Sequence, residues 1–100
     1  MDKKLVTLPI AQHVLWHFGD QNLGLQPGTF VVRLLLTMSA ADNENLAKLE
    51  QVFPGYVAAF KAASREYWGM EWLTKLVKRS LVPDRLGPDL FEAAAGSVQS

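Results

Sequence analysis

The chain has 100 residues, of which 49% are hydrophobic and 20% charged, a composition that excludes intrinsic disorder because disorder needs low hydrophobicity and high net charge. Ten basic residues balance ten acidic ones, so the zero net charge predicts no overall attraction to nucleic acid or to an anionic membrane. The sequence contains no cysteine, which excludes disulfides, thiolate metal sites and a cysteine nucleophile. We therefore expect a cytoplasmic protein with no cofactor.

The first predicted helix runs from about residue 8 to 18. Its apolar side chains recur every four residues, as expected for one helical stripe: Ile10, Val14 and Phe18. Thr7 is a suitable N-cap, and Pro9 falls in the first turn, where its missing N–H is not needed. Gly19 supplies the left-handed position that ends many helices.

A loop over residues 20–28 precedes a second helix that begins near Thr29. The run from Phe30 to Met38 is apolar except for Arg33 and Thr37, and it is too short to span a bilayer. A helix that is apolar nearly all round belongs inside a bundle or in an oligomer interface. We therefore expect this helix at the centre of the fold.

The helical phase continues from residue 29 to 53 without a shift, although Asp42 and Asn45 fall inside the apolar stripe. Two interpretations are open. Asp42 could cap a new helix after a break, or one continuous or gently kinked helix could carry both polar groups toward the core. Because the phase is unbroken, we predict the continuous helix.

Pro54 predicts the start of the next helix, whose stripe extends to Tyr67, and Gly69 predicts a bend before a last long helix over residues 70–81. A short helix from Pro88 to Ala95 follows. The sequence thus predicts an all-α bundle of four to five helices around the 29–53 helix, in a single domain spanning residues 1–96 with a frayed tail at 97–100.

Several short motifs between about residues 16 and 60 resemble small, uncharacterised helical proteins encoded by phages of actinobacteria. The motifs are Trp16-x-x-Gly19-Asp20-Gln21, Pro27-Gly28-x-Phe30, Ala41-Asp42-x-x-Asn45 and Leu49-x-x-x-Phe53-Pro54-Gly55-Tyr56-Val57. The resemblance implies a compact helical protein that acts in the cytoplasm of an infected bacterium. It transfers no functional residues.

His13, His17 and Asp20 stand at helical spacing and could present three metal ligands on one face. The glutamate that accompanies His-x-x-x-His in zinc hydrolases is missing, and Asp20 lies beyond the end of the predicted helix. The polar face of an amphipathic helix explains the same pattern, and we predict no metal site.

A second polar group consists of Arg33, Asp42 and Asn45, which lie in apolar surroundings. These residues could form a buried ligand site, or an internal ion pair or capping network that fixes the helix register. We favour the network.

Aromatic and basic residues gather between residues 61 and 79, where the local charge is positive. Aromatic residues and arginine dominate protein-interface hot spots, so we predict a partner-binding surface there: Tyr67, Trp68, Trp72, Lys75 and Arg79. Stacking of nucleic-acid bases on the same rings is an alternative, although nucleic-acid-binding domains are usually strongly basic.

No phosphate-binding loop and no nucleophile elbow occurs, and we expect no enzymatic activity. The predicted function is a protein-interaction module, a phage factor that binds and modulates a host protein. We also expect a homodimer or higher oligomer, because the second helix is too apolar for a small monomer to cover. The alternative is a small-ligand or nucleotide binder with a pocket at an oligomer interface around Arg33 and Thr37.

Overall fold

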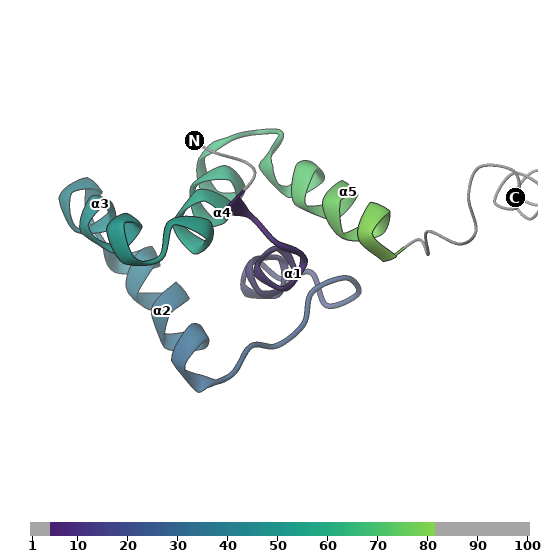
Figure 1. Cartoon of the computed structure of the whole chain (residues 1–100), viewed down its shortest axis with the longest axis horizontal. Helices are drawn as coiled ribbons and strands as arrows, with labels where there is room; N and C mark the ends of the chain where they lie inside the picture. Colours follow the sequence, from purple (N-terminus) through teal and green to yellow (C-terminus); the bar gives the residue numbers. More distant parts are fainter. Residues whose placement is uncertain (1–4, 82–100) are drawn as a thin grey trace, which may run out of the picture.

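A computed structural model describes residues 5–81, which form five α-helices and no strand (Figure 1). The helices are α1 (Leu8–His17), α2 (Thr29–Ala40), α3 (Asn43–Val52), α4 (Pro54–Arg65) and α5 (Gly69–Leu81). The predicted all-α class is confirmed. The predicted helix over residues 88–95, the domain end at 96 and the tail at 97–100 lie outside the described residues.

Helix α4 is the centre of the bundle, since it contacts each of the other four helices. Figure 1 looks almost along α1, with α2 and α3 on one side of it and α5 on the other. Half of α4 is buried, mostly through small side chains that let neighbouring helices approach closely: Gly55, Val57, Ala58, Ala59, Phe60 and Ala62. The bundle is therefore organised around α4 and not around the 29–53 segment.

The continuous 29–53 helix is wrong, because the chain breaks between α2 and α3. Ala41 and Asp42 both adopt extended backbone conformations, with ψ of 139° and 178°. The Asp42 side chain accepts a hydrogen bond of 2.8 Å from the backbone N–H of Asn45. An N-cap of this kind satisfies one of the donors that a helix start leaves unpaired, so the alternative interpretation of Asp42 is the one that holds.

Helix α1 ends just before Gly19, as the sequence predicts. Gly19 has a φ of +102°, which is the left-handed conformation that glycine adopts without strain. Asp20 then closes a tight turn by accepting hydrogen bonds from the backbone N–H groups of Asn22 and Leu23, at 2.9 and 3.0 Å. Asp20 is thus a turn residue of the loop between α1 and α2.

All five helices contribute to one hydrophobic core. Leu15, Leu35, Met38, Leu46 and Leu73 are its largest fully buried side chains. Among the helices that the structure describes, none has both the length and the apolar character needed to cross a membrane.

Candidate functional site

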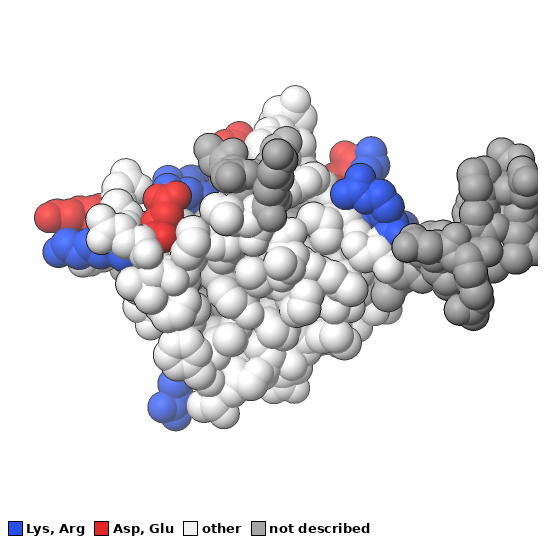
Figure 2. Space-filling model, viewed as in Figure 1, with Lys and Arg blue, Asp and Glu red and all other residues white. Residues whose placement is uncertain are grey.

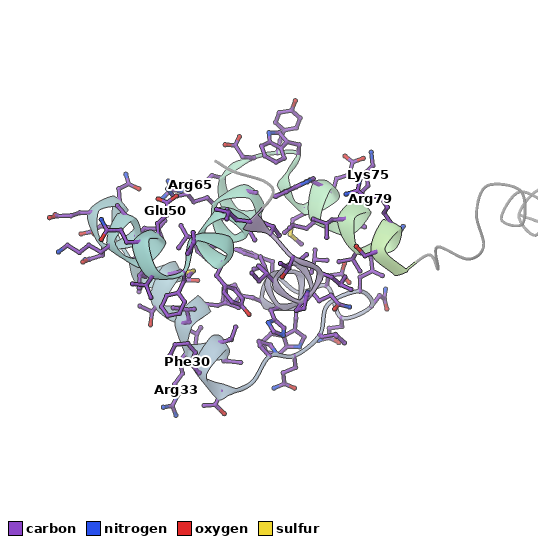
Figure 3. The ribbon with its side chains drawn as sticks, viewed as in Figure 1. Phe30, Arg33, Glu50, Arg65, Lys75 and Arg79 are labelled. Carbon is purple, nitrogen blue, oxygen red and sulfur yellow. The ribbon has the colours of Figure 1, made fainter. Side chains whose placement is uncertain are left out.

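The five predicted partner-binding residues lie along α5 and the short segment before it, and we call this set the α5 surface: Tyr67, Trp68, Trp72, Lys75 and Arg79. The last four recur at helical spacing, so they share one face. Figure 3 shows Lys75 and Arg79 projecting from the outer side of α5. Tyr67 is 98% exposed, which is far above what a random aromatic residue retains in a folded domain.

Two indole rings form one wall of a shallow groove on this surface. The centroids of Trp68 and Trp72 are 5.8 Å apart, and the rings meet edge to face at 68°, a favoured geometry for aromatic pairs. The groove has a volume of about 280 Å³, and Glu71 and Lys75 complete its lining. Lys75 Nζ lies 3.3 Å from Glu71 Oε2, so a solvent-exposed ion pair forms its polar edge.

Gly69 fixes the position of this groove against α4. A Cβ atom at this position would lie 1.7 Å from the backbone oxygen of Ala62, far inside van der Waals contact. Only glycine therefore allows the first turn of α5 to cross α4 at this separation. Trp68 and Trp72 flank the crossing, and the N–H of Trp72 bonds the carbonyl of Trp68 at 2.9 Å.

Helix α4 does not extend to Tyr67, so its predicted place in the α4 stripe is wrong. The helix ends at Arg65, because Glu66 adopts an extended conformation with φ −105° and ψ 135°. Because the helix ends there, Tyr67 lies outside the bundle and is exposed to solvent, next to Trp68 in the chain.

The basic residues between 61 and 79 do not gather into one patch. Lys61 Nζ lies 3.5 Å from Glu50 Oε1, and Arg65 donates a hydrogen bond of 2.8 Å to Asn43 Oδ1, so both side chains reach toward α3. Lys75 and Arg79 project from α5 at a distance from them (Figures 2 and 3). A nucleic-acid surface needs its cations along one groove or face, and this division disfavours that alternative.

The two histidines bond neighbouring helices instead of facing each other. His13 Nδ1 lies 2.8 Å from the Tyr56 hydroxyl, and the two rings are parallel within 3°. His17 Nε2 lies 3.0 Å from Ser39 Oγ. Burial lowers the pKa of both histidines and raises the pKa of Tyr56. Within residues 5–81 no three potential ligands converge on a metal, and Asp20 is engaged in its turn.

The contact between His17 and Ser39 resembles the nucleophile and base of a hydrolase, but its hydrogen bonding runs in the opposite direction. Ser39 Oγ lies 3.1 Å from the carbonyl of Leu35, to which it donates its one proton. The hydroxyl can then only accept from His17 Nε2–H. A serine nucleophile must instead donate its proton to the histidine, so this geometry supports a structural role.

Arg33, Asp42 and Asn45 are all exposed, so their predicted burial is wrong. Asp42 and Asn45 are exposed because the chain breaks after α2 and a new helix begins there. Arg33 is exposed because it lies on the side of α2 away from its buried residues. Asp42 and Asn45 form the capping pair described above, as the favoured network interpretation predicts in part. Arg33 has no ion pair or hydrogen bond from its side chain to another described residue.

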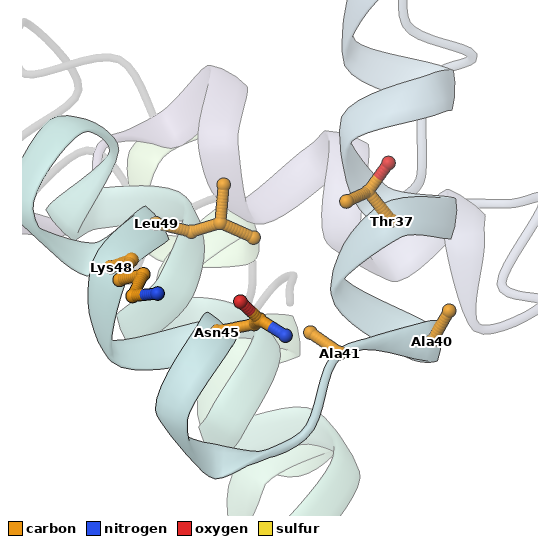
Figure 4. Close-up of a pocket in the computed structure, with 6 residues that line it drawn as sticks. All are labelled: Thr37, Ala40, Ala41, Asn45, Lys48 and Leu49. Carbon is orange, nitrogen blue, oxygen red and sulfur yellow. The ribbon is translucent and has the colours of Figure 1, made fainter.

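A second groove lies between the C-terminal end of α2 and helix α3, and we call it the α2–α3 groove (Figure 4). It has a volume of about 340 Å³. Its lining is mostly apolar or small: Thr37, Ala40, Ala41, Asn45, Lys48 and Leu49. Asn45 and Leu49 face Thr37 across it.

Three exposed apolar side chains lie on α2 and α3 and were missed as individual site residues. Phe30 is 64% exposed, Leu36 56% and Val52 68%. For Phe30 and Leu36 the signal in the sequence was the apolar character of the second helix on all sides, which predicted an interface without assigning residues to it. That signal does not extend to Val52, which lies on α3.

Comparison of the chain with protein-family models, with curated proteins and with solved structures finds no match. The case for a function therefore rests on the two grooves and on the side chains around them. The α5 surface combines one exposed and two partly buried aromatic rings with cations. The α2–α3 groove combines apolar and polar lining residues, and the two helices that form it carry exposed apolar side chains.

Proposed function

We propose that this chain is a non-enzymatic protein-interaction module that binds a partner protein through the α5 surface. The observation that carries the proposal is Tyr67, which is 98% exposed and directly precedes Trp68, one of the residues that line the groove. Tyrosine and tryptophan supply large contact areas at a low cost in conformational entropy.

The chemistry of the surface defines the kind of partner. The groove suits an apolar side chain of the partner, and Lys75 and Arg79 suit an acidic rim around that side chain. The resemblance to phage-encoded proteins extends the proposal to a host protein in the bacterial cytoplasm as the partner. The apolar α2 further supports self-association into a homodimer or higher oligomer.

The test is capture from a bacterial lysate with the tagged full chain, read by mass spectrometry. We expect one stoichiometric protein, and its recovery should fall at least tenfold with Tyr67→Ala, as is typical of an interface hot spot. Because Tyr67 contributes almost nothing to the core, its removal should leave the melting temperature unchanged.

Val52→Ala is the matched control, since Val52 is also an exposed apolar residue but lies on α3. The Val52→Ala variant should recover as much of the partner protein as the wild type does. Capture of no protein, or capture that is insensitive to Tyr67→Ala and to Trp72→Ala, would contradict the proposal. Recovery of material that absorbs at 260 nm and is lost at high salt would favour the nucleic-acid alternative.

The α2–α3 groove supports a second candidate function, the binding of a small ligand at an oligomer interface. Thr37 lines this groove, as that interpretation predicts, but Arg33 does not. A nucleotide that binds there would raise the melting temperature at concentrations above its Kd. Thr37→Val and Asn45→Leu should then abolish the increase.

A further inference from the structure

We infer that the exposed face of α2 is a two-fold self-docking surface, on which Phe30 of each copy enters the α2–α3 groove of the other. The inference rests on the self-association named in the proposed function, and it is independent of the α5 surface. It specifies a second copy of this chain as the partner, the register in which the two α2 helices pair, and the residues that come into contact.

The exposed face of α2 carries one stripe at helical spacing, formed by Phe30, Arg33, Thr37 and Ala40. Its two large side chains lie in the N-terminal half of the helix, and its two small side chains lie in the C-terminal half. Large residues at one end and small residues at the other make the stripe complementary to an antiparallel copy of itself.

The positions of these residues define the register. Phe30 and Ala40 lie five residues on either side of Leu35, and Arg33 and Thr37 lie two residues on either side. A two-fold axis at the level of Leu35 therefore places Phe30 opposite Ala40 of the second copy, and Arg33 opposite Thr37. Closed, isologous pairing of this kind is the commonest symmetry of soluble oligomers.

The groove lies where this register needs it. Ala40, Ala41 and Thr37 form its α2 side, and its volume of about 340 Å³ is ample for a phenyl ring. Phe30 already contacts Phe53 of its own chain, with ring centroids 5.8 Å apart, yet it stays 64% exposed. The exposed part of the ring is the part that a second copy would cover.

Charge supports the same arrangement. Arg33 is isolated at the end of α2 remote from α3, as Figures 2 and 3 show. Side chains on a helix tilt toward its N-terminus, so in an antiparallel pair Arg33 reaches toward the C-terminal end of the second α2. The last turn of that helix has no basic residue, and it carries the negative pole of the helix dipole followed by the Asp42 carboxylate. The cation at this end is Lys48 of α3, which lines the groove.

The size of the contact predicts its strength. Helix α2 has 12 residues, so it is about 18 Å long, and an interface built on it lies at the small end of stable complexes, which bury roughly 1,200–2,000 Å². We therefore expect a dimer with a dissociation constant in the micromolar range.

The experiment is sedimentation velocity on the full chain, from about 5 µM to about 500 µM, which spans that range. The wild type should shift from monomer to dimer. Phe30→Ala removes the side chain that enters the groove, and Ala40→Arg places a cation opposite Phe30, where it also repels Arg33 of the second copy. Each should raise the dissociation constant at least tenfold.

Tyr67→Ala is the matched control, because it removes a more exposed aromatic side chain that lies off α2. It should leave the dissociation constant unchanged. Should Phe30→Ala alter the circular dichroism spectrum, Ala40→Arg alone decides, since Ala40 is exposed and contributes nothing to the core.

Cross-linking tests the register directly, since the chain contains no cysteine. Protein with Arg33→Cys, mixed with an equal amount of protein with Thr37→Cys, should form a disulfide-linked heterodimer faster than either protein alone. A mixture of Lys75→Cys and Arg79→Cys proteins is the control and should not cross-link faster than its components.

Three outcomes would overturn the inference. A wild type that stays monomeric throughout contradicts both the self-docking surface and the proposed self-association. A dimer that tolerates both α2 variants shows that the chain associates through another face. A dimer that the variants weaken, but that cross-links no faster in the Arg33→Cys and Thr37→Cys mixture, excludes the antiparallel register. None of these outcomes bears on partner capture by the α5 surface.

Discussion

Helices α2 and α4 have the same length of 12 residues but occupy opposite roles in the bundle. Helix α2 is the more apolar of the two, yet three of its residues are buried against six in α4. Helix α4 owes its position to alanine and glycine, which let four other helices approach its axis. The comparison teaches that in a domain of this size hydropathy alone does not select the central helix, because side-chain volume decides how closely helices can pack.

The largest expected effect is the difference between two neighbouring leucines of α2. Leu35 is fully buried and Leu36 is 56% exposed. Leu35→Ala should lower the free energy of unfolding by about 2–5 kcal/mol through lost burial and the cavity that remains. Leu36→Ala should cost less than about 1 kcal/mol. Urea denaturation at low protein concentration measures the free energy of unfolding of both variants. Equal losses of stability would contradict the difference in burial between Leu35 and Leu36.

A second test concerns the close crossing of α4 and α5. Gly69→Ala forces a methyl group against the backbone of Ala62, and we expect a loss of about 1–3 kcal/mol in the free energy of unfolding. Gly28→Ala is the control, because nothing lies within 4 Å of its Cβ position. That substitution should change stability by less than about 1 kcal/mol.

The break between α2 and α3 predicts a smaller effect. Asp42→Ala removes the cap of α3 and should cost about 1 kcal/mol. Asp42→Asn keeps an acceptor for the Asn45 N–H and should lie close to the wild type in the same thermal unfolding experiment. Equal melting temperatures for the Ala variant and the wild type would show that the cap contributes nothing to α3.

The smallest effect concerns pH. Burial holds the pKa of His13 and His17 below the ordinary value of 6.5 in the folded chain, so the unfolded state binds more protons in that range. Stability should therefore fall as the pH drops below about 6.5. The melting temperature of the wild type should decrease more between about pH 7.5 and pH 5.5 than that of the double variant His13→Gln, His17→Gln. Parallel decreases in the two proteins would assign the pH dependence to other groups.

Local signals in the sequence predict most of the fold. Proline and glycine mark the starts and ends of helices through backbone geometry alone, so the starts near Leu8, Thr29 and Pro54 are predicted correctly. The break at Asp42 is not predicted correctly. The apolar residues of α2 and of α3 each recur with the helical period, and along the sequence the two patterns stay in phase across the two extended residues. Phase continuity is thus no proof of a continuous helix, whereas the capping side chain is the better signal.

The residues of the candidate sites likewise differ in how far the sequence predicts their positions and contacts. The sequence groups Trp68 and Trp72 among the aromatic and basic residues of the 61–79 segment, and the structure brings both into one groove. Because the sequence predicts a bend at Gly69, between the two residues, it does not predict the edge-to-face contact of their rings. The partners of His13 and His17 lie 43 and 22 residues away in the sequence. Pairing over such distances depends on how the helices pack, which residue spacing does not encode. The exposure of Tyr67 likewise depends on where α4 ends.

The close crossing at Gly69 also sets the thermodynamics of recognition on the α5 surface. Because the backbone of α5 abuts the backbone of α4 there, the two tryptophans take up their positions when the chain folds and not when a partner arrives. A preorganised surface spares the complex the ordering entropy that a flexible one would lose on binding. What remains to be ordered is Tyr67, and partners should therefore differ in affinity chiefly by how well they immobilise that one ring.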